Sequence, residues 1–229
     1  MDARDVSCII PVFNGERHIE AALRSVLDQT AGVPDVIVVD DGSTDSTADI
    51  VRRFGSGVRY FCQPNAGPTR ARNLGLSKAG GSLVAFLDAD DLWCREKLAR
   101  QLDAFDLHPR LDYCVTWVEN FAETPTEEVN AGRPATVAGF SVVSLLARRA
   151  AFDRVGPFRS DLQHAADTHW FLRAGELGLV HRVIDEVLVR RRLRSNSRSQ
   201  EHARRSQREY LELLKAHLDR KRARASEAR

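Results

Sequence analysis

Three carboxylates within four residues carry the strongest chemical signal in the sequence. Asp88, Asp90 and Asp91 directly follow the apolar run 83–87. Such a run is typical of a strand buried on both faces, and ligands bind at the carboxyl ends of strands in open parallel sheets. Because neighbouring carboxylates repel one another, the cluster becomes favourable around a divalent cation such as Mg²⁺ or Mn²⁺. The alternative is an acidic turn that caps the next helix.

A second acidic pair ends another predicted strand. Asp40 and Asp41 follow the apolar run 36–39. Parallel strands share their carboxyl edge, so we expect both acidic clusters to lie on the same rim of a sheet. Arg70 and Arg72 lie near the start of a predicted helix between these strands, and Asp167 lies on a later one.

The elements that must position these residues alternate between strand and helix. Buried strands are predicted at 6–13, 36–39, 58–61 and 83–87, with helices at 16–29, 46–54 and 69–79 between them. The short connections indicate a parallel, right-handed α/β sheet. Further along, the pattern predicts a helix at 95–106, a strand at 113–118, a long loop at 119–139, helices at 150–155 and 165–177, and one or two strands at 180–189.

Composition describes an ordinary globular chain. Its 229 residues are 43% hydrophobic and 29% charged, enough for one domain or one domain with a small appendage. No run approaches the roughly 20 apolar residues of a membrane span, and the first five residues contain no signal-peptide core. The four cysteines lack metal-type spacing, so free, buried thiols in a reducing compartment are expected. These features favour a cytoplasmic location.

The net charge of +2 hides a basic C-terminal segment. Residues 190–229 contain 14 basic and 5 acidic side chains. From 199 the chain reads as a helix with Tyr210, Leu211, Leu214 and Leu218 on one side, and 221–229 is predicted to fray. A basic helix suits peripheral contact with the inner face of a membrane or dimerisation. Nucleic acid is disfavoured as a partner, because no recognisable nucleic-acid module or interleaved aromatic residues accompany the charge.

Absent motifs remove several enzyme classes. No glycine-rich dinucleotide fingerprint follows the first strand, and no phosphate-binding loop of the GxxxxGK[ST] type occurs. A GxSxG nucleophile elbow is also missing from the sequence. Dinucleotide-dependent dehydrogenases, P-loop kinases and serine hydrolases of that type are therefore disfavoured.

Four motifs in order resemble the signature of family 2 glycosyltransferases. They are PVFN at 11–14, VVDDGSTD at 38–45, NAGPTRARN at 65–73 and LDADD at 87–91. Looser similarity continues at 152–158 and 166–173. The resemblance implies the GT-A fold, an α/β structure with a mostly parallel central sheet flanked by helices. It also implies inverting, metal-dependent transfer of a sugar from a nucleoside diphosphate to an acceptor, which the sequence does not identify.

The resemblance divides the chain into three parts. Residues 1–120 would form the nucleotide-sugar-binding half, 121–195 the acceptor-side half of the same domain, and 196–229 a basic C-terminal helix or tail. The loop 119–139 would be a mobile lid or acceptor loop.

The family motifs assign candidate roles in donor binding. A UDP-sugar is the favoured donor. Phe13 would pack by the nucleobase, with a core phenylalanine as the alternative, and Asp40 and Asp41 would bind base and ribose, with helix capping as the alternative. Arg70 would approach the diphosphate, whereas Arg72 is interpreted as a solvated helix residue. The full set of expected donor-binding residues is Pro11, Phe13, Asn14, Asp40, Asp41, Asn65, Gly67, Arg70, Asp88, Ala89 and Asp90.

The family motifs also imply a metal and a base. Asp90 would ligate Mn²⁺ or Mg²⁺, and Asp88 would reach the ribose or a metal-bound water. Asp167 is the candidate catalytic base that takes the acceptor proton, with an ordinary acid of the first helical turn as the alternative. His164 and His169 lie close enough in sequence to tune or replace it.

Two departures from the family pattern keep other functions open. Ala166 stands where the family usually has a glutamate, and Arg194 stands where many relatives have a histidine near the diphosphate or metal. A nucleotide-sugar-binding protein without transferase activity is therefore the second hypothesis. A nucleotidyltransferase is disfavoured, because the loop after the first strand is too short for a glycine-rich, basic loop.

Overall fold

The computed structural model describes residues 1–122, 135–162, 165–193 and 203–227. The strands are β1 (Val6–Val12), β2 (Asp35–Asp40), β3 (Val58–Cys62), β4 (Leu83–Phe86), β5 (Leu92–Trp93), β6 (Tyr113–Ala122), β7 (Thr136–Ala138), β8 (Leu146–Arg148) and β9 (His181–Leu193). The α-helices are α1 (Ile19–Leu27), α2 (Thr47–Arg52), α3 (Pro68–Lys78), α4 (Lys97–Leu107), α5 (Arg149–Val155), α6 (Ala166–Glu176) and α8 (Ala203–Glu227). Short 3₁₀ turns lie at Ala3–Asp5, Gly55–Gly57 and Val142–Ser144.

Within the described residues, these strands form one mixed sheet. The order is β3-β2-β1-β4-β8-β6-β9-β5, and β7 pairs with the outer part of β6. The first four strands are all parallel, as the alternating pattern predicts. β8 is antiparallel to both β4 and β6, and β5 is antiparallel to β9. The sheet is therefore parallel in the half that carries both acidic motifs and mixed in the rest.

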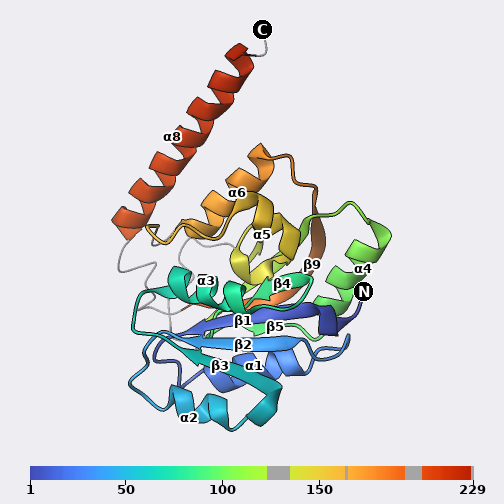
Figure 1. Cartoon of the computed structure of the whole chain (residues 1–229), viewed down its shortest axis with the longest axis vertical. Coiled ribbons are helices and arrows are strands. Elements are labelled where there is room, and N and C mark those ends of the chain that lie inside the picture. The colour runs from blue at the N-terminus through green and yellow to red at the C-terminus, as the bar shows by residue number, and fades with distance from the viewer. Residues whose placement is uncertain (123–134, 163–164, 194–202, 228–229) are drawn as a thin grey trace.

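Helices cover both faces of the sheet. In Figure 1, α3, α5 and α6 lie on one side of strands β1–β3, and α1 and α2 lie on the other. The buried side of α1 has helical spacing, with Ile19, Ala22, Leu23 and Val26 buried. α8 extends away from the body of the molecule, and its C-terminal end lies at the far tip (Figure 1).

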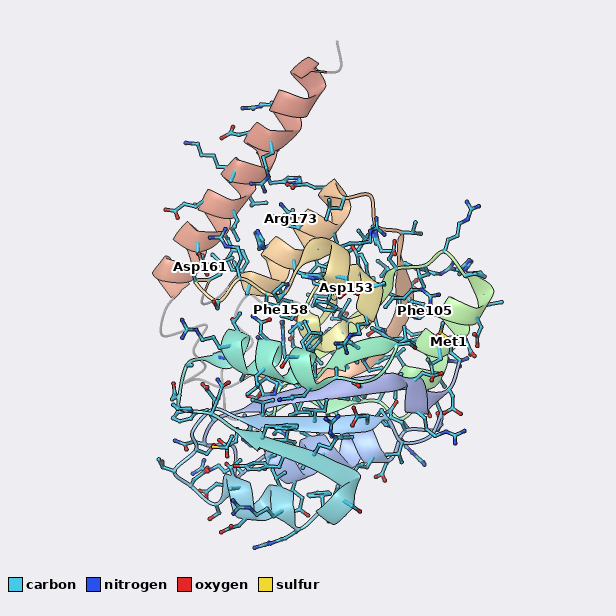
Figure 2. The ribbon with its side chains drawn as sticks, viewed as in Figure 1. Met1, Phe105, Asp153, Phe158, Asp161 and Arg173 are labelled. Carbon is cyan, nitrogen blue, oxygen red and sulfur yellow. The ribbon has the colours of Figure 1, made fainter. Side chains whose placement is uncertain are left out.

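An aromatic cluster joins the two halves of the chain. The ring of Phe86, the last residue of β4, lies 5.3 Å from the ring of Phe158. Phe152 on α5 lies 4.8 Å from Trp170 on α6. Phe158, which is labelled in Figure 2, contacts both rings. Tilted and edge-on contacts of this kind stabilise a core beyond the area they bury. Phe152 and Phe158 thereby connect α6 to the central strand that precedes Asp88.

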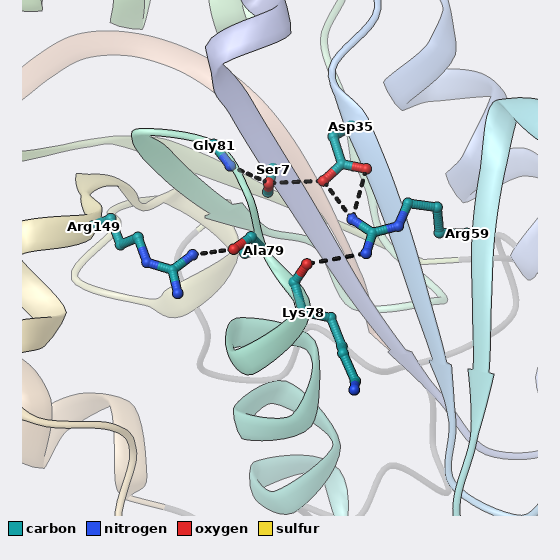
Figure 3. A network of polar contacts seen from close by, with 7 residues as sticks. All are labelled: Ser7, Asp35, Arg59, Lys78, Ala79, Gly81 and Arg149. Carbon is teal, nitrogen blue, oxygen red and sulfur yellow. Dashed lines mark hydrogen bonds and ion pairs between the residues drawn. The ribbon is translucent and has the colours of Figure 1, made fainter.

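A polar network ties together the amino ends of the parallel strands, opposite the acidic edge. Ser7 donates to Asp35 at 2.9 Å, and Arg59 donates to Asp35 at 3.0 Å and to the carbonyl of Lys78 at 3.1 Å (Figure 3). The amide of Gly81 donates to Ser7 at 3.0 Å, and Arg149 donates to the carbonyl of Ala79. This bracing occupies the amino ends and leaves the carboxyl ends to the acidic motifs.

Several expectations about the second half are corrected. The range 119–139 is not one long loop: β6 continues to Ala122 and β7 begins at Thr136, while 123–134 lies outside the described residues. β5, β7 and β8 were not expected at all, because each has only two or three residues. The one or two strands expected at 180–189 are a single strand, which begins at His181 and continues to Leu193 because it pairs along the whole of β6.

The last helix differs from its predicted pattern. It continues to Glu227, through most of the range predicted to fray. Leu213 is buried, whereas Leu211, Leu214 and Leu218 are exposed by 67%, 44% and 50%. The inward side of α8 is therefore not the side that the leucine spacing indicated.

The structure also describes the cysteines and the apolar character of the helices. All four cysteines are free thiols; Cys8 and Cys114 are buried, Cys94 is half-buried and Cys62 is exposed. Among the helices of the described residues, none has both the length and the apolar character that a membrane crossing needs.

Candidate active site

The three acids after β4 occupy different environments. Asp88 forms an ion pair with Arg72 of α3, and both side chains are partly buried. Asp91 is only 2% exposed, and it accepts a hydrogen bond from the backbone amide of Arg192 on β9 at 2.8 Å. The Arg192 side chain donates to the carbonyl of Asp90 at 3.0 Å. β9 therefore holds the DADD turn from one side and α3 from the other.

Electrostatic strain in this turn favours a cation. Burial raises the pKa of Asp91 well above its ordinary value, and the negative charges of Asp90 and Asp88 raise it further. The described residues contain no preformed group of three or more metal-ligating side chains. The donor set nevertheless fits a hard divalent cation, since carboxylate oxygens are the ligands that Mg²⁺ and Mn²⁺ prefer. Asp90 and Asp88 are the partly exposed members that can hold one.

Asp40 and Asp41 are buried acceptors at the neighbouring strand end. Asp40 accepts from the hydroxyl of Tyr60 and from the amide of Ser43, both at 2.7 Å. Asp41 accepts from the side chain of Gln63 at 2.7 Å, and from the backbone amides of Ala66 and Gly67 at 2.8 Å each. Both carboxylates thus fix the loops around them, a role that the helix-cap alternative did not foresee.

Asp41 shapes the loop that precedes α3. Gly67 has a φ of +93°, which favours glycine, and its amide points at the Asp41 carboxylate. Asn65 and Arg70, on either side of this turn, are exposed. The two expected donor-binding residues therefore flank a turn that a buried carboxylate holds in place.

The loop after β1 meets the loop after β2. Pro11 is buried within β1, whereas Phe13 is 38% exposed at the strand's end, which excludes its alternative as a core residue. Asn14, with a φ of +50°, accepts from the amide of Thr44 at 2.9 Å, and its own amide donates to Ser43 at 2.9 Å. Phe13 and Asn14 consequently share one rim with Asp40 and Asp41.

Arg72 links the acidic turn to the candidate base. Its side chain is only 15% exposed, so the interpretation of Arg72 as a solvated helix residue is wrong. Its positive charge acts on Asp88 and on Asp167, which lies in the first turn of α6. The Nε of Arg72 is buried and has no hydrogen-bond partner within the described part of the chain. A buried guanidinium with a spare donor suits an anionic group in this site.

Asp167 is a half-buried carboxylate whose environment makes it more basic. Burial raises its pKa, the amide of Thr168 and the charge of Arg72 lower it, and the charge of Asp88 raises it. The shift is upward overall. His169, one residue further along α6 than Thr168, is half-buried, and burial lowers the pKa of its imidazole. His164 and Arg194, the other residues considered for this region, lie outside the described residues.

Sequence reasoning missed the supporting residues. Tyr60 lies on the strand next to β2, so it could have been found once the order β3-β2-β1 was assumed. Arg192 acts on Asp91 through its backbone, and no side-chain pattern announces such a contact.

Comparison with known proteins identifies the family of this chain. The model of the family "Glycosyl transferase family 2" matches residues 7–183. The chain belongs to this family. The match includes every described site residue named above except Arg192, and it ends before α8.

Individual relatives of the chain are also named as glycosyltransferases. The chain is 41% identical over 102 residues to the putative teichuronic acid biosynthesis glycosyltransferase TuaG of Bacillus subtilis. The matched region covers 43% of this chain and 40% of TuaG. It spans 14% to 41% of the length of eight curated glycosyltransferases that it matches.

Two solved structures share the fold. S. aureus TarS in complex with UDP-GlcNAc aligns with a TM-score of 0.71 and 23% identity, over 87% of this chain and 61% of that one. The mannosyltransferase PcManGT of Pyrobaculum calidifontis, in complex with GDP-Man and Mn²⁺, aligns with a TM-score of 0.66 and 24% identity, over 89% of this chain and 62% of that one. The GT-A fold expected from the motifs is thus confirmed.

Proposed function

We propose that this chain transfers a sugar from a nucleoside diphosphate to an acceptor, with inversion at the sugar carbon. The observation that carries the proposal is the meeting of Asp88, Arg72 and Asp167 at the carboxyl edge of the parallel strands. It joins the DADD turn to a carboxylate with a raised pKa on another element. Such a pairing of a binding turn and a separate base suits a displacement reaction.

The donor half is proposed to be 1–120. Phe13 offers an exposed ring to the nucleobase. Asp40 and Asp41 retain acceptor capacity beyond the hydrogen bonds described, because an ionised carboxylate offers about four lone-pair sites. Pro11, Asn14, Asn65, Gly67, Arg70 and Ala89 complete the proposed donor-binding set. A UDP-sugar remains the favoured donor; TarS binds UDP-GlcNAc and PcManGT binds GDP-Man.

The leaving group carries the negative charge that this site must manage. Asp90, with Asp88, is proposed to hold Mn²⁺ or Mg²⁺, which would supply Lewis-acid assistance to the departing diphosphate. Arg72 offers its buried Nε as a donor to the same anionic group. Arg70 is exposed on the same helix and would add a second positive charge.

Inversion requires a base on the face of the sugar opposite the leaving group. We assign this role to Asp167, which would take the proton from the acceptor hydroxyl. Its raised pKa makes it a better proton acceptor than an ordinary aspartate. Ala166, which replaces the usual glutamate, is buried and has no group that could share this task.

The acceptor side is proposed to be 121–195, and the acceptor remains unassigned. The free cysteines support a cytoplasmic location. The basic segment 196–229 supports peripheral contact with an anionic membrane face, or dimerisation.

Donor turnover tests the proposal. The purified chain is incubated with UDP-, GDP- and dTDP-sugars with Mn²⁺ or Mg²⁺, and released nucleoside diphosphate is measured. Asp90→Asn is compared with Asp103→Asn, which changes an acid on α4 outside the site. Metal-dependent release from one donor, lost only in Asp90→Asn, would support the proposal. Donor binding without release under any condition would favour the binding-protein hypothesis, and release of pyrophosphate would indicate a nucleotidyltransferase.

A further inference from the structure

α8 packs against the helix that carries the candidate base. The carboxylate of Glu209 accepts a hydrogen bond from the backbone amide of Ala165 at 3.0 Å. Ala165 is the N-cap residue of α6 and has no side chain that can cap the helix. A glutamate in the first turn of a helix often bonds the N-cap amide. Here a glutamate from another helix makes the equivalent bond.

A second contact lies directly at the candidate base. Tyr210, the next residue on α8, is half-buried and hydrogen-bonds the side chain of Thr168. Burial raises the pKa of the Tyr210 hydroxyl, and the negative charge of Asp167 raises it further. Glu209 and Tyr210 therefore contact Ala165 and Thr168, which flank Asp167 in sequence.

An ion cluster fastens the other end of α6. Glu176 is the last residue of that helix, and its side chain is only 7% exposed. It accepts from Nδ1 of His217 at 2.8 Å and from Nε of Arg220 at 2.9 Å. Leu213, which lies between Tyr210 and His217 in sequence, is buried. α8 thus contacts both ends of α6.

We propose that α8 completes the candidate active site, with Glu209 and Tyr210 as positioning residues that fix the first turn of α6 and hence the Asp167 carboxylate. This inference rests on the proposed function and deepens it. α8 lies beyond residue 183, where the family match ends, so the Glu209 and Tyr210 side of these contacts lies outside the matched region. Small misplacements of a reacting group cost up to about 10²-fold in rate, so such bracing matters.

Kinetics of the full chain separate positioning from simple folding. In Glu209→Ala the Ala165 amide loses its acceptor, and kcat should fall about tenfold with the donor KM unchanged. Glu209→Gln keeps an oxygen that accepts the same hydrogen bond, so it should restore most of kcat. Asp219→Asn is the matched control, since Asp219 lies on the exposed part of α8.

Hydrogen exchange gives a readout that does not need activity. Amides 165–168 should exchange faster in Glu209→Ala than in the wild type, and at the wild-type rate in Asp219→Asn. Unchanged exchange together with unchanged kcat in Glu209→Ala would overturn the inference. A fall in kcat that Glu209→Gln does not restore would also overturn it. A wild type that turns over no donor would refute the proposed function and the positioning role with it, while the exchange rates would still report whether α8 docks.

Discussion

Replacing Arg72 with methionine removes the positive charge that acts on the carboxylates of Asp88 and Asp167. The side chain of Arg72 is 15% exposed and that of Asp88 is 34% exposed, so water screens this site only in part. The charge of Arg72 lowers the pKa of Asp167, and that of Asp88 raises it. A nearby opposite charge lowers a carboxylate pKa because it favours the charged form, and a nearby like charge raises it. Because Arg72→Met also leaves Asp88 uncompensated, we expect the pKa of Asp167 to rise.

The pH dependence of kcat measures this shift. The deprotonated form of Asp167 is the active base, so kcat rises with pH through its pKa, above the ordinary aspartate value. In Arg72→Met this acid limb should move to higher pH, because the charge that lowers the pKa of Asp167 is gone. Arg72→Lys keeps a charge and should move it less, and Lys78→Met, an exposed change on α3, should not move it.

An unshifted pH profile would show that the charge of Arg72 does not reach Asp167. If Arg72→Met binds donor but its acid limb stays at the wild-type pH or moves lower, Arg72 does not act on the base. Donor affinity and circular dichroism of each variant establish that the protein is folded before the limbs are compared.

Three further predictions concern stability. Burial lowers the pKa of Lys97 to about 8, so on raising the pH the folded state loses this proton before the unfolded state does. The free energy of unfolding should therefore rise by up to about 3 kcal/mol between about pH 8 and 10.5. In Lys97→Met urea titrations across that range should show no such rise, and a pH slope identical to that of the wild type would contradict the prediction. Asp41→Ala leaves two backbone amides without their acceptor and should cost about 2–4 kcal/mol in chemical denaturation, and a loss below about 0.5 kcal/mol would contradict the bracing role. A Cβ on Gly75 would lie 2.4 Å from the side chain of Ile9, whereas one on Gly175 would meet nothing within 4 Å. Gly75→Ala should therefore lower the melting temperature, and Gly175→Ala should not. Equal shifts in the two variants would contradict this packing argument.

The parallel half of the fold could be predicted because its signals are local. β1, β2 and β4 are short apolar runs, and all the residues of β1 and β4 are buried. Strand, turn and helix follow one another with short connections, which limits the topology. The acidic motifs lie at strand ends, so their shared rim followed from strand direction alone.

The rest depends on contacts between distant parts of the chain. Asp90 and Asp91 are neighbours of the same type, yet only Asp91 is buried, because β9 reaches it from about 100 residues away in sequence. Arg70 and Arg72 differ likewise: one is exposed and the other is paired with Asp88. Helix α3 has too few apolar residues for its periodicity to show which arginine points inward. The docked side of α8 was also hidden, since Glu209 and Glu176 decide it rather than leucine spacing.

Donor turnover by Asp167→Asn tests whether Asp167 is the catalytic base. We predict that this variant binds the donor as the wild type does, but releases nucleoside diphosphate at least about 10²-fold more slowly, because an amide cannot take the acceptor proton. Asp185→Asn, an exposed acid on β9, should release it at the wild-type rate. Wild-type turnover by Asp167→Asn would contradict the assignment of the base and with it the chemistry proposed for this site.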